Sequence, residues 1–190
     1  MSVYLLRHGQ TDWNKIGRVQ GRTDVPLNDE GRRQADEARK ILESVPFIRC
    51  YVSPLIRAQE TARIALAGKN VDVVLEPRLV EMAYGDYEGK DWTKGDYQRD
   101  RRVIGLRHHG GENYFDVAHR AYSFLDEIGE IARQGNILLV CHGGIARVIN
   151  TYFIDEVDND SFIDNICPNG GIRVYEYPKR NVPLRLDMPE

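Results

Sequence analysis

Two histidines, His8 and His142, each lie at the end of a short apolar run and precede a glycine. The runs cover residues 3–6 and 137–141. Runs of this kind are typical of strands buried on both faces of a parallel sheet. Because side chains just past the carboxyl ends of such strands converge on one crevice, the two imidazoles are expected to face each other there, with Arg7 beside the first.

The pair Arg7 and His8 could perform phosphoryl transfer. An imidazole can attack phosphorus through one ring nitrogen when a hydrogen bond, often to a backbone carbonyl, fixes the other nitrogen. The planar guanidinium of Arg7 would hold phosphoryl oxygens. A single His-Gly is more often a structural histidine that ends a strand, so this interpretation depends on further residues.

Further candidate ligands for phosphate follow along the chain. Asn14 and Arg18 belong to a polar, glycine-containing segment at 13–21 that predicts a loop over the end of the first strand. Arg57 falls in the first turn of a predicted helix, where the helix dipole favours an anion. A bound phosphate would explain an arginine there, and a solvated surface arginine is equally compatible with the sequence.

A proton donor could come from the segment at 79–89, which contains three acids after the third predicted strand. Glu81, Asp86 or Glu88 could protonate a leaving oxygen. The spacing does not say which of the three does so, and a solvated acidic loop is the default interpretation for each.

Composition limits the class of protein. The chain has 190 residues, of which 42% are hydrophobic and 29% charged, as is typical of one globular domain covering 1–190. A net charge of −3 gives no reason to expect nucleic acid or an anionic membrane as a partner. We expect no membrane span and no secretory signal. The three cysteines (Cys50, Cys141 and Cys167) lack metal-ligand spacing and are interpreted as reduced thiols of a cytoplasmic protein.

Strands and helices alternate along the chain. Runs rich in β-branched or aromatic residues predict strands at 3–7, 48–52, 71–75, 137–141 and 172–177. Helical periodicity lies between them, with start signals at four places: Asn28, Pro54 as a first helical residue, Asn113 with Asp116 three residues on, and Gly144 before a helix reaching about Phe153. This alternation predicts a mostly parallel sheet with helices on both faces.

Residues 85–111 interrupt the alternation, because they are polar, charged and punctuated by glycine. A segment of this length inside a compact domain is usually functional, so we expect a small cap over the site. Its basic run at 98–109 either recognises a second anionic group on the substrate or is a solvated face. The adjacent His108 and His109 lack the spacing of a helical metal site.

Six phrases in unbroken order resemble the histidine phosphatase superfamily, also called the phosphoglycerate mutase-like proteins. They are Arg-His-Gly at 7–9, Trp-Asn at 13–14, Gln-Gly at 20–21, Ser-Pro-Leu-x-Arg-Ala-x-x-Thr-Ala at 53–62, Glu-x-x-x-Gly-x-x-Glu-Gly at 81–89 and His-Gly-Gly at 142–144. The resemblance extends from Val3 to about Tyr175, nearly the whole chain.

The resemblance implies roles for particular residues. His8 would be the nucleophile that forms a phosphohistidine, and Glu81 the general acid. The expected phosphate and substrate contacts are Arg7, Asn14, Gln20, Gly21, Arg57, Tyr84, His142 and Gly143. The resemblance also implies a three-layer α/β/α sandwich with a mixed sheet of about six strands, and no metal or organic cofactor. The expected partner is a small phosphorylated metabolite, and the chain could form a homodimer.

The family contains phosphatases and mutases, and several departures from the mutase pattern favour a phosphatase. Met82 stands where mutases have an arginine after the catalytic glutamate, and Gly143-Gly144 replaces Gly-Asn. The run at 110–113 is similar to a phosphatase Gly-Gly-Glu-Ser phrase. Arg101-Arg102 and Tyr84 match substrate contacts of mutases instead. The sequence therefore predicts a phosphomonoester hydrolase, with a mutase or a non-catalytic phosphate-binding module as alternatives.

Overall fold

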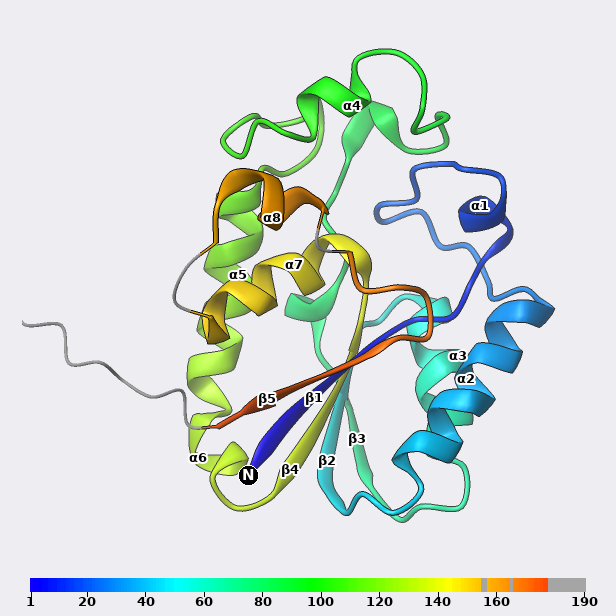
Figure 1. Ribbon diagram of the computed structural model, residues 1–190, viewed down its shortest axis with the longest axis vertical. Helices are drawn as coiled ribbons and strands as arrows, with labels where there is room; N and C mark the ends of the chain where they lie inside the picture. The colour runs from blue at the N-terminus through cyan, green and yellow to red at the C-terminus, as the bar shows by residue number, and fades with distance from the viewer. Residues whose placement is uncertain (155–156, 165, 178–190) are drawn as a thin grey trace, which may run out of the picture.

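The fold is built on one sheet, which lies between two layers of helices in Figure 1. The computed structural model describes residues 1–154, 157–164 and 166–177, and the rest of the predicted domain lies outside these residues. The strands are β1 (Ser2–Arg7), β2 (Phe47–Val52), β3 (Asp72–Leu75), β4 (Asn136–Cys141) and β5 (Ile172–Glu176). Each of the five strands predicted from the sequence is therefore present, with bounds shifted by at most one residue.

The strand order is β3-β2-β4-β1-β5. Pairs β1–β4, β2–β4 and β2–β3 are parallel, and β5 runs antiparallel to β1 at the edge. The mostly parallel mixed sheet is confirmed, but the expected number of about six strands is wrong for the described part of the chain. Two further contacts, Thr11 with Leu27 and Arg18 with Asp91, are isolated bridges, because the polar, glycine-containing segments around them do not continue as strands.

Helices cover both faces of the sheet. The longer ones are α2 (Asp29–Leu42), α3 (Ile56–Ala65), α5 (Tyr114–Glu127) and α7 (Gly143–Phe153). The shorter ones are α1 (Asp12–Lys15), α4 (Tyr97–Asp100), α6 (Gly129–Ala132), α8 (Asn159–Asp164) and the 3-10 turns η1 (Pro77–Leu79) and η2 (Gly85–Tyr87). The predicted caps Asn28 and Asn113 both accept a backbone N–H bond in the first turn.

Alternate residues of β4 define the two halves of the core. Leu138 and Val140 pack with the apolar side chains of α2 and α3, whereas Ile137 and Leu139 pack with those of α5 and α7. This is the period of two expected of a strand buried on both faces. The result is the three-layer α/β/α sandwich, with α2 and α3 on one side of the sheet and α5–α7 on the other (Figure 1).

Two local expectations are wrong. Pro54 is not the first helical residue, because the backbone N–H of Ser53 still pairs with Val140 O at 3.0 Å and Leu55 is extended, so α3 begins at Ile56. Asn14 lies in the one-turn helix α1 rather than in a loop, because it forms a reciprocal capping box with Thr11.

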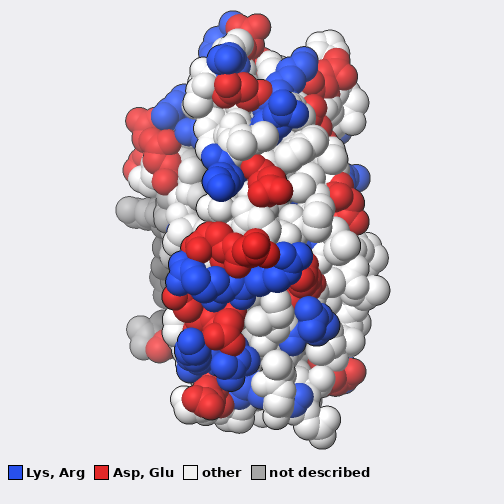
Figure 2. All heavy atoms as spheres, turned by 90° about the vertical axis from the view of Figure 1, so that its right-hand side faces the viewer, with Lys and Arg blue, Asp and Glu red and all other residues white. Residues whose placement is uncertain are grey.

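The surface formed by α2 carries charges of both signs. Figure 2 shows Lys and Arg next to Asp and Glu over this face, with no large region of one sign. Within α2 the charges pair three or four residues apart, as in Arg33 with Glu30 and Arg39 with Asp36. Across the described residues, no helix is both long and apolar enough to cross a membrane.

Candidate active site

The site lies where three neighbouring parallel strands end. β2, β4 and β1 are adjacent in the sheet, and Ser53, His142 and His8 directly follow them. The two imidazole ring centroids are 5.1 Å apart, so the structure brings together the histidines that the sequence pattern placed at one crevice. Residues 85–111 lie across this end of the sheet, at the top of Figure 1.

His8 is held as a neutral nucleophile would need to be. Its Nδ1 lies 2.7 Å from the carbonyl oxygen of Gly9, which can only accept, so Nδ1 carries the proton and Nε2 keeps its lone pair. The side chain is 2% exposed. Burial, followed by the charges of Arg57 and Arg7, lowers the pKa of His8 well below its usual range.

His142 lies next to His8 but is not among the residues that line the cavity. Its Nε2 lies 2.6 Å from the Oγ of Ser53, and its Nδ1 has no partner among the described residues. Burial, together with the charge of Arg57, lowers the pKa of His142 well below its usual range. The ring is therefore neutral in the ligand-free protein.

Two guanidinium groups flank His8, that of Arg57 buried and that of Arg7 half-buried. Arg57 is 1% exposed and donates to the carbonyls of Gly21 (2.8 Å) and Thr23 (2.9 Å), while Arg7 donates to Cys167 O at 2.6 Å. Burial lowers the pKa of Arg57 to about 10. Within the described part of the chain, no carboxylate forms an ion pair with either group. Because a buried charge without a counterion is unfavourable, the site is complementary to an anion.

The neighbouring loop supplies further polar groups. The Oδ1 of Asn14 accepts from the backbone N–H of Thr11 (3.1 Å) and from Asn169 Nδ2 (3.2 Å), which leaves its Nδ2 to donate to a ligand. Gln20 lines the cavity, where its Oε1 accepts from the Thr11 hydroxyl. Gly21 has a φ of +54°, which favours glycine, so the backbone there can approach the site closely.

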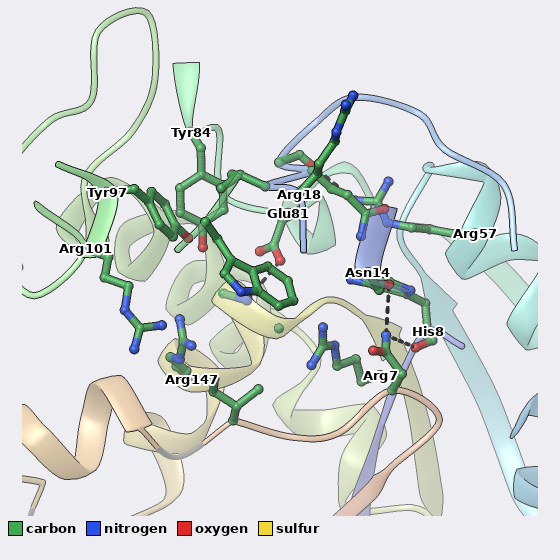
Figure 3. A pocket seen from close by; sticks show the side chains of 18 of the residues that line it. Arg7, His8, Asn14, Arg18, Arg57, Glu81, Tyr84, Tyr97, Arg101 and Arg147 are labelled. Carbon is green, nitrogen blue, oxygen red and sulfur yellow. Dashed lines mark hydrogen bonds between the residues drawn. The ribbon is translucent and has the colours of Figure 1, made fainter. Parts of the chain in front are cut away.

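Glu81 is anchored at the N-terminus of α7. Its Oε2 accepts from the backbone N–H of Gly144 at 2.9 Å, and its Oε1 accepts from those of Ile145 (3.0 Å) and Met82 (2.8 Å). The residue is 7% exposed. These donors fix the carboxyl group at the cavity wall, on the side away from the Asn14 loop (Figure 3).

The structure separates the three acids that spacing alone left open, and it places in the cavity the one that the family resemblance indicated, Glu81. Glu88 accepts from the backbone N–H groups of Arg22 and Thr23, so it holds the loop whose carbonyls bind Arg57. Asp86 lines a different hollow, with His108 and other residues outside the site. Of the three acids, only Glu81 lines the cavity that contains His8.

The cavity has a volume of about 420 Å³. Every predicted site residue except His142 lines it, namely Arg7, His8, Asn14, Gln20, Gly21, Arg57, Glu81, Tyr84 and Gly143. Arg101, Arg147 and Tyr97 line the side opposite His8 (Figure 3). Among the described residues, no group of three or more His, Cys, Asp or Glu is placed to hold a metal ion.

The sequence reasoning missed several wall residues, among them Arg147 and Asn169. Arg147 lies four residues after Gly143, on the same face of α7, and it is buried. A single arginine at that spacing from the His-Gly phrase is a signal that could have identified it. Asn169 precedes β5 and reaches His8 O at 3.1 Å only through the tertiary fold, so no local signal marks it.

Gly144→Ala is expected to lower kcat/KM about 10²-fold, because a displacement of about 1 Å in a catalytic group can have that effect. A Cβ at this position would lie 2.6 Å from Glu81 Oε1 and 2.7 Å from the Tyr84 hydroxyl, so the carboxyl group must move. Steady-state kinetics and a melting curve test this. Gly105→Ala is the matched control, since its Cβ would meet nothing closer than 3.5 Å. Equal activity of both variants would contradict the prediction.

The fold and the cavity define an α/β protein with a histidine and several guanidinium groups in one pocket at the strand ends. The sequence model of the histidine phosphatase superfamily (branch 1) matches residues 3–186. Probable phosphatase C1687.21 of Schizosaccharomyces pombe is 33% identical over 162 residues, which are 82% of this chain and 75% of that protein. The 2,3-bisphosphoglycerate-dependent phosphoglycerate mutase 2 of Gloeobacter violaceus is 34% identical over 159 residues, 77% of this chain and 73% of that one. The crystal structure of the alpha-ribazole phosphatase from Shigella flexneri matches with a TM-score of 0.79 at 28% identity, covering 92% of this chain and 89% of that one.

The chain belongs to the histidine phosphatase superfamily, branch 1. This confirms the resemblance that the six sequence phrases indicated, and with it an enzyme of the histidine phosphatase class.

Proposed function

We propose that this protein hydrolyses a small phosphomonoester through a phosphohistidine on His8, with Glu81 as general acid and base. One observation carries the proposal. A neutral imidazole lines a cavity beside two guanidinium groups, one buried and one half-buried, that form no ion pair with a described carboxylate. A phosphate dianion would supply the missing negative charge, and a neutral nucleophile is not repelled by it.

In the first step, His8 Nε2 attacks phosphorus, and a P–N bond forms as the P–O bond to the leaving group breaks. Glu81, protonated at the start, gives its proton to the departing oxygen. Arg7, Arg57 and the amide of Asn14 hold the nonbridging oxygens, so that positioning and charge stabilisation provide most of the rate enhancement. His142, bonded to Ser53 through Nε2, does not line the cavity and is given no contact with the phosphoryl group in this step.

In the second step, water attacks the phosphorus of the phosphohistidine. The carboxylate of Glu81 takes a proton from this water, the P–N bond breaks, and its electron pair returns to Nε2. Inorganic phosphate leaves, and His8 is again neutral and hydrogen-bonded to Gly9 through Nδ1. Each turnover restores the protonated Glu81 that the next one needs.

The cavity wall opposite His8 favours a substrate that carries a second anionic group. Arg101 and Arg147 both line the cavity beside Tyr97, and the Nε of each is buried without a partner among the residues described. Arg147 donates to the Tyr114 hydroxyl at 3.3 Å, and Arg101 reaches the exposed Asp164 only at 3.4 Å. This wall also favours the second candidate, a mutase, since a phosphoglycerate carries such a group. Met82 is fully buried and does not reach the cavity, which favours the phosphatase.

A panel of phosphorylated metabolites decides between these candidates. Phosphate release is measured with sugar phosphates, phosphoserine, 3-phosphoglycerate and nucleotides, beside the conversion of 3- to 2-phosphoglycerate with bisphosphoglycerate added. We expect hydrolysis of at least one ester and no isomerisation. Isomerisation faster than hydrolysis would assign a mutase. Saturable binding of inorganic phosphate without turnover of any ester would assign a phosphate-binding module.

Glu81→Gln is expected to lower kcat/KM about 10²- to 10³-fold for alkyl phosphates and much less for 4-nitrophenyl phosphate, whose leaving group needs no proton. Parallel assays of the two esters measure this. Asp86→Asn is the control, because Asp86 lies outside the cavity. Equal losses for both esters would remove the general-acid role from Glu81.

A further inference from the structure

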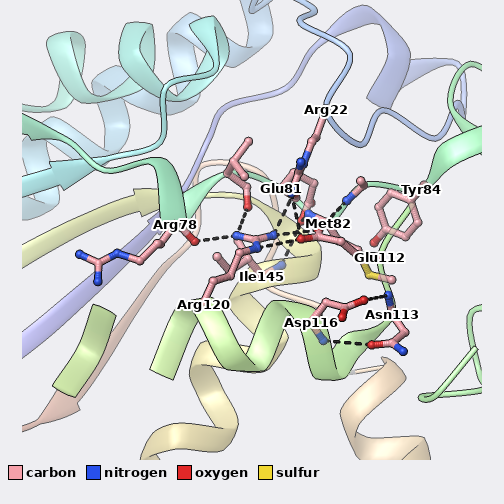
Figure 4. A network of polar contacts seen from close by, with 12 residues as sticks. Arg22, Arg78, Glu81, Met82, Tyr84, Glu112, Asn113, Asp116, Arg120 and Ile145 are labelled. Carbon is pink, nitrogen blue, oxygen red and sulfur yellow. Dashed lines mark hydrogen bonds and ion pairs between the residues drawn. The ribbon is translucent and has the colours of Figure 1, made fainter. Parts of the chain in front are cut away.

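A buried ion pair lies behind Glu81, outside the cavity. Arg120 of α5 and Glu112, which precedes α5, are each 14% exposed at the side chain, and Arg120 Nε donates to Glu112 Oε1 at 3.1 Å. Neither residue lines the cavity, and neither takes part in the proposed reaction. Figure 4 shows the guanidinium of Arg120 hydrogen-bonded to Glu112 and to the backbone near Glu81.

Arg120 uses all of its hydrogen-bonding capacity here. A guanidinium has five N–H donors in a fixed plane. Besides the Nε bond, these donors reach Arg78 O (2.6 Å), Val80 O (2.7 Å), Glu81 O (3.2 Å) and Glu112 Oε2 (3.2 Å). Three of the five bonds therefore end on backbone carbonyls: one on Arg78 in η1, and two on Val80 and Glu81 in the segment that follows η1.

That segment needs such partners. It joins η1 to η2 and lies in no helix or strand, so its backbone groups have no regular hydrogen-bond partners. Glu112 holds the other side of Glu81, because its Oε2 accepts from Ala83 N at 2.9 Å and its own N–H donates to Ala83 O at 2.9 Å. The backbone is thus fixed on both sides of Glu81, while α7 fixes the carboxyl group.

We propose that Arg120 and Glu112 are positioning residues that set the place of the Glu81 carboxyl for proton transfer to the leaving group. The inference rests on the proposed role of Glu81. It assigns a function to an arginine and an acid that never touch the substrate. A lysine at position 120 would keep the positive charge but not the planar set of five N–H donors, so it could not bond to three carbonyls and a carboxylate at once.

The inference is tested with Arg120→Lys and Glu112→Gln in the full-length protein. Each should lower kcat/KM about 10- to 10²-fold for an alkyl phosphate and less than about threefold for 4-nitrophenyl phosphate. Arg107→Lys is the matched control, since Arg107 forms an exposed ion pair with Asp116 at the start of the same helix. If Arg120→Lys does not fold, Glu112→Gln alone decides, because it keeps the shape of the side chain.

A double variant separates this inference from the function on which it rests. When Glu81 is already glutamine, Arg120→Lys should add little further loss on the alkyl ester, because both changes act on the same proton transfer. Equal losses on the two esters, or additive losses in the double variant, would overturn the inference alone. If Glu81→Gln itself shows no preference between esters, the general-acid proposal fails, whatever Arg120→Lys does.

Discussion

His8→Ala is expected to lower kcat at least about 10⁴-fold, because no other group in the cavity can accept the phosphoryl group covalently. Glu81 is bound to the start of α7, and His142 does not line the cavity, so neither can replace the imidazole. The alanine also leaves space where water could reach the substrate, but such water would lack the aligned lone pair of Nε2. Phosphate release over a range of enzyme concentrations measures the residual rate.

The same variant tests the covalent intermediate. Wild-type protein quenched during turnover of a ³²P-labelled ester should carry a label that is stable in alkali and lost in acid, and His8→Ala should carry none. His119→Ala is the control, because His119 is exposed on α5 and does not line the cavity. Labelling of His8→Ala, or turnover within about tenfold of the wild type, would exclude a phosphohistidine on His8.

Arg57→Met should have the second largest effect, a loss of about 10³-fold in kcat/KM. An arginine that stabilises transferring phosphoryl oxygens contributes on this scale in other enzymes. Arg57 has no described carboxylate partner, so its charge is available to the substrate, although its two Nη atoms also hold Gly21 O and Thr23 O. The kcat/KM of Arg57→Lys should lie between those of the wild type and Arg57→Met, since lysine keeps the positive charge but lacks the planar array of N–H donors.

Inorganic phosphate distinguishes lost binding from lost structure in these variants. Phosphate should raise the melting temperature of the wild type by binding only the folded state, and Arg57→Met should lose most of that increase. Arg63→Met is the matched control, because Arg63 lies on α3 but is exposed. A full phosphate-dependent increase in Arg57→Met, with near-normal kinetics, would show that Arg57 does not bind the phosphoryl group.

Features that depend on neighbours in sequence could be predicted. The strands follow from apolar runs, and the caps Asn28 and Asn113 from side chains that bond to N–H groups three residues on. Arg57 was placed correctly in the first turn of α3, although the helix starts two residues later than the Pro54 signal predicted. The strand ends in turn placed His8 and His142 in one crevice.

Features that depend on residues far apart in the sequence could not be predicted from local patterns. Spacing left Glu81, Asp86 and Glu88 open and only the family resemblance named Glu81, because the position of its carboxyl group depends on a bond to Gly144 N, 63 positions away in the chain. The hydrogen bond that orients the His142 ring links it to Ser53, 89 positions away. Such contacts exist only once the strands have paired, so no local pattern encodes them.

The sequence by itself determined the family, the order of the elements and the two strand-end histidines, because motifs and periodicity are local properties of the chain. The tertiary structure decided that Glu81 lines the cavity with His8 and that His142 is buried without lining it. It also decided that Arg120 and Glu112 bond to the backbone around Glu81 from outside the cavity. These outcomes depend on burial and on long-range hydrogen bonds, and both arise only when the layers pack together.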